Sequence, residues 1–124
     1  MSSQFQTVFL ELRQILSRHR GKLFVAEDSP LCYRLEGGIH PKHKKPFPIA
    51  WVVINKNYVS FHHMGVYAKP ELLQDISNQL RNRMQGKSCF NFNSVDIALF
   101  TELETLTLRA FDAFRETPLL KLGD

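Results

Sequence analysis

Two runs of β-branched and aromatic residues, FPIAWVVI at 47–54 and YVSFHHM at 58–64, are separated by only Asn55, Lys56 and Asn57. Residues of this kind favour extended backbone, and asparagine tolerates the positive φ angles of a tight turn. The stretch therefore predicts a β-hairpin, which is the best-supported local element of the chain.

Apolar residues recur with helical spacing in three other places. They predict a first helix over about residues 4–19, a second over about 70–83 and a long third helix that Asp96 can cap. The proline at position 70 fits the first turn of a helix, and basic residues near 83 complement the dipole at its end.

Short alternating segments supply the remaining strands, KLFVAED at 22–28, LCYRLE at 31–36 and KSCFNF at 87–92. This order of elements predicts an α+β fold: a two-layer sandwich with an antiparallel sheet of about five strands and three helices packed on one face. At 124 residues we expect a single domain over 1–124, with an ordered core over about 4–116 and a C-terminal tail over 117–124.

Composition narrows the classes of partner. The net charge is +4, and the basic residues cluster only in HPKHKK at 40–45, which indicates a solvated loop; lysines beside its two histidines would repel a metal ion. Without interleaved aromatic residues this loop is a weak nucleic-acid signal, so nucleic-acid binding is not expected.

The longest apolar run, 49–54, is too short to cross a bilayer. We expect a soluble, cytoplasmic protein with no membrane association, in which Cys32 and Cys89 are reduced, buried thiols.

The adjacent histidines, His62 and His63, invite a metal-site hypothesis. Neighbouring side chains of a strand point to opposite faces of the sheet, so the two rings cannot easily bind one ion together. Val59 and Phe61 share the parity of His63, which predicts that His63 faces the helices.

Tyr58, Ser60 and His62 then face outward. A two-residue hairpin turn would place Trp51 in the same outward row, whereas a three-residue turn would reverse its direction. An exposed row of this kind is typical of a binding surface. The alternative is that Trp51 belongs to the core, covered by the 37–48 loop or by a second subunit. The ligand-binding candidates are Trp51, Tyr58, Ser60, His62, His63 and Lys87.

Catalytic motifs are absent from the sequence. G-x-S-x-G and HExxH do not occur, and Gly86-Lys87 lacks the earlier glycine and the following helix of a phosphate-binding loop. We therefore expect no catalytic residues, no metal site and no cofactor. A binding protein is expected rather than an enzyme. A closed pocket that holds His63, Lys87 and Cys89 together would favour an enzyme.

The ordered segments LCYRLEGG, FPIAWVVINKNYVSFHH, PELL and QGKSCFNF, followed by a long closing helix, resemble the YdhG-like domain family of bacteria. The resemblance runs from about Phe5 to Phe114. It implies a frataxin-like two-layer sandwich and, because one member is regarded as an intracellular iron chaperone, an iron-carrier function. In this chain Glu27, Asp28 and Glu36 are the carboxylates that could serve as hard-metal ligands.

The sequence thus leaves two functional hypotheses. The first is a small intracellular binding module that uses the open sheet face to bind a protein or a small anionic ligand. The second is the frataxin-like iron chaperone or metal carrier. A homodimer is a further possibility, since a sheet with one uncovered apolar face can cover it with a copy of itself.

Overall fold

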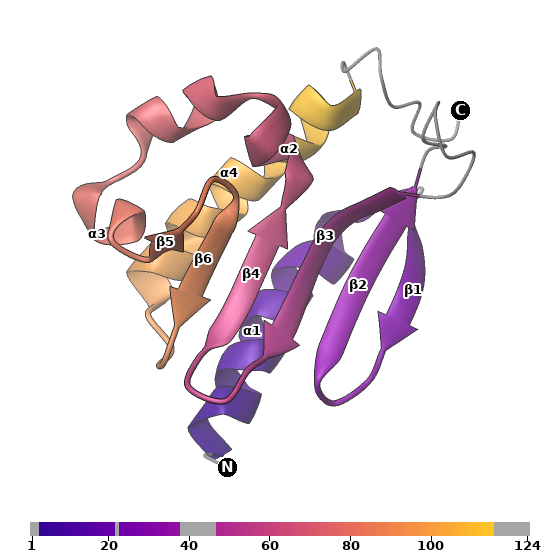
Figure 1. Cartoon of the computed structure of the whole chain (residues 1–124), viewed down its shortest axis with the longest axis vertical. Coiled ribbons are helices and arrows are strands. Elements are labelled where there is room, and N and C mark those ends of the chain that lie inside the picture. Colours follow the sequence, from indigo (N-terminus) through magenta and orange to yellow (C-terminus); the bar gives the residue numbers. More distant parts are fainter. Residues whose placement is uncertain (1–2, 22, 38–46, 116–124) are drawn as a thin grey trace.

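The computed structural model describes residues 3–21, 23–37 and 47–115 (Figure 1). Its sheet has six antiparallel strands in the order β1-β2-β3-β4-β6-β5. The strands are β1 (Phe24–Asp28), β2 (Cys32–Gly37), β3 (Phe47–Ile54), β4 (Val59–His63), β5 (Met84–Gln85) and β6 (Cys89–Phe92). Helices α1 (Ser3–His19) and α4 (Ile97–Arg115) lie behind the sheet in the view of Figure 1. The predicted α+β sandwich is confirmed.

The turn of the β3–β4 hairpin has two residues, the length that places Trp51 in the outward row with Ser60 and His62. Ile54 pairs with Val59, and the Asn55 N–H donates to the Tyr58 carbonyl at 2.8 Å. Only Lys56 and Asn57 remain unpaired, so the turn has two residues and Trp51 stands opposite His62. The two side chains therefore share one side of the sheet, as the two-residue turn predicted.

The hydrophobic core lies between the sheet and the two long helices. Both helices present apolar stripes to it with the spacing of one helical face. Its largest fully buried side chains are Tyr33, Phe9, Phe61, Phe90, Phe92, Phe111, Leu12, Leu16, Leu35, Ile49 and Leu80. Asp96 caps α4 as predicted, because its Oδ1 accepts from the Leu99 N–H at 3.1 Å.

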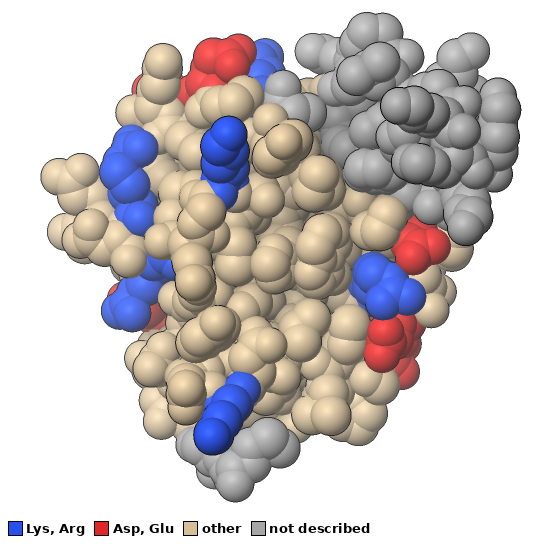
Figure 2. All heavy atoms as spheres, viewed as in Figure 1, with Lys and Arg blue, Asp and Glu red and all other residues tan. Residues whose placement is uncertain are grey.

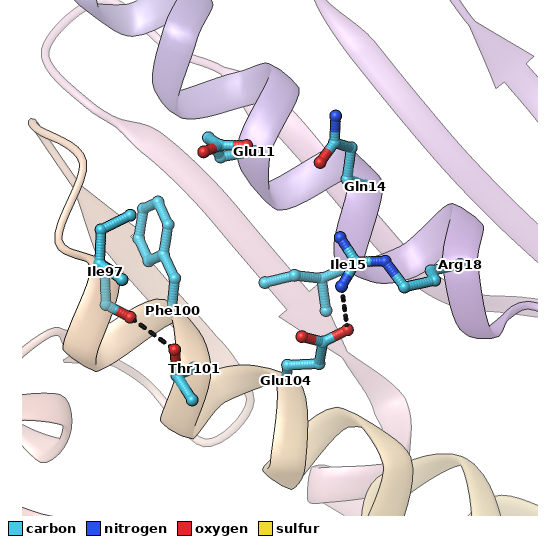
Figure 3. A pocket seen from close by; sticks show the side chains of 8 residues that line it. All are labelled: Glu11, Gln14, Ile15, Arg18, Ile97, Phe100, Thr101 and Glu104. Carbon is cyan, nitrogen blue, oxygen red and sulfur yellow. Dashed lines mark hydrogen bonds and ion pairs between the residues drawn. The ribbon is translucent and has the colours of Figure 1, made fainter.

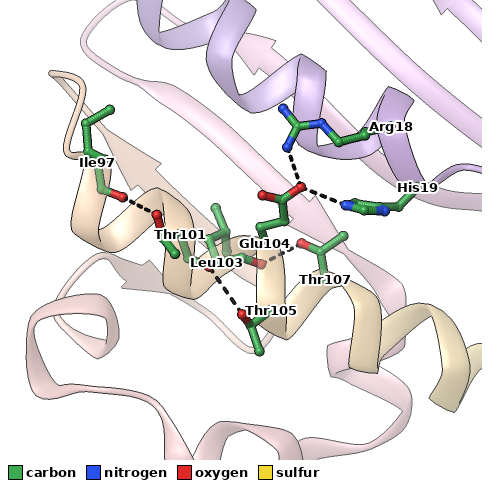
Figure 4. A network of polar contacts seen from close by, with 8 residues as sticks. All are labelled: Arg18, His19, Ile97, Thr101, Leu103, Glu104, Thr105 and Thr107. Carbon is green, nitrogen blue, oxygen red and sulfur yellow. Dashed lines mark hydrogen bonds and ion pairs between the residues drawn. The ribbon is translucent and has the colours of Figure 1, made fainter.

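Polar contacts tie α4 to α1, and threonine hydroxyls make further contacts along α4 itself (Figure 4). The Glu104 carboxylate accepts from Arg18 and lies against His19, both at 2.7 Å. Hydroxyls of Thr101 and Thr107 donate to the carbonyls four residues earlier, which satisfies them without breaking the helix. The two helices are thus joined by one carboxylate as well as by the core.

The prediction of a single helix over 70–83 is wrong. The segment forms a 3-10 helix η1 (Pro70–Asp75) and a short helix α3 (Asn78–Arg81), separated by extended backbone at Ile76 and Ser77. Ser77 causes the break, because its Oγ accepts from the Leu80 N–H at 3.1 Å and so starts a new helix. Helix α2 (Met64–Ala68) and strand β5 were not predicted either.

Within the described residues, no helix combines the length and the apolar character that a membrane span requires. The basic 40–45 segment and the predicted 117–124 tail lie outside the described residues, as does most of the 37–48 loop.

Candidate binding surface on the open sheet face

The side of the sheet opposite α1 and α4, here called the open face, carries one row of side chains that crosses all six strands. Cross-strand pairing sets this transverse row in register from β1 to β5. Its members are Glu27, Arg34, Trp51, His62, Cys89 and Gln85. Neighbours along the strands, such as Val52 and Phe61, are buried on the helical side. Hydrophobic alternation therefore fixes which residues reach the open face.

At the middle of the row the rings of Trp51 and His62 stack, with centroids 4.8 Å apart and planes 15° from parallel. This separation equals the spacing between neighbouring strands, so each ring leans on the next across the β3–β4 ladder. Both side chains are half-buried. Burial lowers the pKa of His62, which keeps its imidazole neutral at pH 7.

Cys89 continues the row beyond His62. Its Sγ lies 3.6 Å from His62 Nε2, and burial raises the pKa of the thiol. The sequence placed Cys89 among Phe90 and Phe92, but those two rings point into the core and Cys89 points to the open face. Cys32 and Cys89 are both free and half-buried, not fully buried as predicted. The thiol and the imidazole thus form a neutral pair, which is not the arrangement of an activated nucleophile.

Ser60 belongs to the same face by register, but the prediction that it is exposed is wrong: only 3% of its surface is accessible. Its hydroxyl accepts from Asn55 Nδ2 at 2.7 Å and donates to Asn91 Oδ1 at 2.9 Å. Asn91 Nδ2 in turn donates to Gln85 Oε1 at 2.7 Å. Ser60 therefore holds two amide side chains in place from beneath.

Sequence reasoning missed these amides. The alternation of Cys89 and Asn91 with two phenylalanines was the available signal that both lie on the open face. Tyr58 is half-buried at the end of the hairpin, two residues from Ser60, and Lys87 is exposed in the turn between β5 and β6. No ion pair of Lys87 occurs in the described part of the chain.

His63 lies on the opposite side of the sheet from His62, as predicted, and is 1% exposed. Its Nδ1 accepts from the Gly65 N–H at 3.0 Å and caps α2, while its ring packs 4.4 Å from that of Phe111. Burial lowers the pKa of His63 to about 3. His63 therefore cannot contact a ligand on the open face, and the sheet separates its side chain from that of Cys89, which is the cross-strand partner of His62.

Charge on the open face is confined to its margin. Figure 2 shows this face with an uncharged middle and with Lys, Arg, Asp and Glu side chains around it. Over β1 and β2, Arg34 binds Glu27 at 2.9 Å and Glu36 at 3.0 Å. Asp28 binds Arg13 at 2.8 Å, so each carboxylate proposed as an iron ligand is paired with an arginine. Within residues 3–21, 23–37 and 47–115, no group of three or more His, Cys, Asp or Glu side chains could hold a metal ion.

A groove lies between α1 and α4, on the other side of the molecule from the open face (Figure 3). It has a volume of about 110 Å³ and an apolar floor that includes Ile15 and Phe100. The Arg18 and Glu104 side chains meet across it at 2.7 Å and neutralise one another. Because this groove is small and Arg18, the only cation among its described lining residues, is paired with Glu104, the open face is the stronger candidate.

The chain was compared with protein-family models, curated proteins and solved structures, and none of them matches it.

Proposed function

We propose that the chain is a non-enzymatic binding module that contacts another protein through its open face. One observation carries the proposal: the stacked Trp51–His62 pair stands at the centre of a sheet face that none of the described helices covers and whose middle is uncharged. Tryptophan dominates the energetics of many protein interfaces, and depletion of charge is typical of their centres.

A protein surface suits this face better than a small anion does. Among the described residues, Arg34 of the transverse row is paired with two carboxylates, and Lys87 lies in a turn beside the row. The central hydrogen-bonding groups are neutral, and Ser60 and Asn91 already have partners. Such a centre offers an anion little charge compensation, whereas it can pack against a neutral protein surface.

The test is capture of partners on the immobilised chain, compared between wild type, Trp51→Ala and Leu108→Ala. Leu108 is an exposed apolar residue of α4, on the side of the molecule away from the open face, and controls for loss of apolar surface in general. We expect a protein retained by wild type and by Leu108→Ala to be lost by Trp51→Ala, with all three variants folded by circular dichroism. Equal capture by Trp51→Ala and wild type would contradict the proposal.

The iron-carrier alternative and the YdhG-like resemblance stay predictions, as does a cytoplasmic location. An iron ion at Glu27, Asp28 and Glu36 would have to displace the arginines that bind them. Calorimetry with ferrous ion on the wild-type chain and on a variant with these three carboxylates neutralised would detect such a site.

A further inference from the structure

Two soft metal ligands meet on the open face. His62 on β4 and Cys89 on β6 are cross-strand partners, and their Nε2 and Sγ atoms are 3.6 Å apart. A tetrahedral zinc ion with its usual bonds to sulfur and to imidazole nitrogen separates these two ligand atoms by about 3.5 Å. The metal-free pair therefore already has the spacing of one edge of a zinc tetrahedron.

We propose that His62 and Cys89 form half of a zinc site that joins two copies of the chain through their open faces. This inference rests on the proposed function, because it names a second copy of the chain as a partner of that face.

The count of ligands requires the second copy. Structural zinc takes four protein ligands, and within the described residues no third His, Cys, Asp or Glu joins this pair. Cys32 belongs to the same face but lies on β2, in register with Val53 and not with the transverse row. A two-fold axis through the ion would add a second His62 and a second Cys89, which gives the two-cysteine, two-histidine set that zinc favours.

Charge balance also fits this face. As the two Zn–S bonds form, the two Cys89 S–H bonds break and two protons pass to solvent; the two Zn–N bonds use imidazoles that are already neutral, and no electron is transferred. Two thiolates cancel the charge of Zn²⁺, so the centre that results is neutral. A neutral centre can be enclosed between the uncharged middles of two open faces without an unpaired charge, which is the costly case in an interface.

The neighbours of the pair hold it ready for a metal. The Trp51 ring stacks on His62 and restricts rotation of the imidazole. The Cys89 S–H donates to Asn91 Oδ1 at 3.4 Å, which holds the sulfur beside His62 in the metal-free chain. This hydrogen bond is lost when the thiol ionises, so the stacked Trp51 ring is the neighbour that keeps a ligand oriented in the metal-bound state as well.

The experiment uses the full chain, stripped of metal with a chelator and then titrated with Co²⁺ or Zn²⁺. We expect half an equivalent of metal per chain, the absorption bands of tetrahedral cobalt with thiolate ligands, and a change from monomer to dimer in sedimentation velocity. Cys89→Ser and His62→Gln should each lose the thiolate–cobalt spectrum or its tetrahedral form, together with the metal-dependent dimer. The matched control, Cys32→Ser, removes the other thiol of this face and should keep both.

Absence of binding, or one metal per monomer, would overturn the inference, and so would a dimer that forms equally with chelator. The two proposals fail separately. Partner capture that persists in chelator and in Cys89→Ser, but is lost in Trp51→Ala, would refute the zinc bridge and support the binding module. A zinc dimer that forms unchanged in Trp51→Ala, without capture of any other protein, would refute the role proposed for Trp51 and leave the bridge intact.

Discussion

At the scale of single residues, His63 is the group whose environment differs most from water. It is buried against Phe111, and its Nε2 has no hydrogen-bond partner among the described residues. Its Nδ1 accepts a hydrogen bond, so the neutral ring carries its proton on Nε2. An imidazolium here would be a buried charge without a counter-ion, which is why burial lowers the pKa to about 3.

This pKa predicts acid sensitivity of the fold. The unfolded chain protonates His63 near its ordinary pKa of 6.5, whereas the folded chain does so near 3. The stability contributed by the neutral ring is therefore present above pH 6.5 and is lost as the pH falls toward 3. We expect this residue to account for a loss of about 2 kcal/mol in the free energy of unfolding between pH 7 and pH 5.

Urea unfolding of wild type and His63→Asn, with chelator present at both pH values, measures the effect. Asparagine can keep the cap on Gly65 with its side-chain oxygen but does not titrate. The carboxylates titrate alike in both proteins, so the difference between the two pH dependences isolates His63. Identical pH dependences would show that this histidine stays neutral in the unfolded chain or charged in the folded one.

Glu102 stabilises the extended backbone between η1 and α3 through hydrogen bonds with Ser77. Its two carboxylate oxygens accept from the Ser77 N–H at 2.6 Å and from the Ser77 hydroxyl at 2.7 Å. Glu102→Ala leaves both donors without their partner, so we expect the free energy of unfolding to fall by about 1 to 2 kcal/mol. Denaturant unfolding should show a much smaller effect for Glu71→Ala, which removes an exposed carboxylate of η1. Equal losses would mean that the Ser77 contacts contribute little.

At the scale of elements, sequence prediction succeeded where one periodic signal acted alone. The hairpin over 47–63 and the helices α1 and α4 follow from alternation and from helical spacing, and Asp96 marks the start of α4. Sequence prediction failed over 64–85: apolar spacing suggested one helix over 70–83, and neither α2 nor β5 was predicted. There Ser77 is engaged by Glu102, a residue 25 positions away, and local periodicity contains no trace of such a contact.

Helix α2 depends on a close approach to α4 at Gly65. A Cβ atom added at this position would lie 2.0 Å from the carbonyl oxygen of Ala110, which is backbone and cannot move aside as a side chain would. We expect Gly65→Ala to shift α2 away from α4 and to lower the free energy of unfolding by about 3 kcal/mol. Thermal and urea unfolding of the variant would measure the loss.

Gly86 supplies the contrasting control. Its φ of 78° favours glycine, but an added Cβ would meet nothing within 4 Å. Gly86→Ala should therefore cost only about 1 to 2 kcal/mol, through backbone strain. A Gly65→Ala variant no less stable than Gly86→Ala would argue against tight packing between α2 and α4.

At the scale of the whole molecule, the strand order decides which residues become neighbours. Parity within the hairpin was enough to place Trp51 beside His62. It could not place Cys89 or Asn91 there, because β6 pairs with β4 across an intervening segment of 25 residues that contains α2, η1, α3 and β5. The half of the site that comes from one hairpin was predictable, and the half that comes from long-range pairing was not.

Because the two sides of the sheet differ, substitutions within the β3–β4 hairpin should separate effects on stability from effects on partner binding. Phe61 is 1% exposed on the helical side, whereas Trp51 is half-buried on the open face. Phe61→Leu leaves a small cavity in the core and Trp51→Ala removes a partly solvated ring, so we expect each to lower the free energy of unfolding by about 1 to 2 kcal/mol. Only Trp51→Ala should reduce partner capture, because Phe61 does not reach the open face. If Phe61→Leu reduced capture as much at matched stability, the loss would follow from destabilisation and the open face would not be the contact surface.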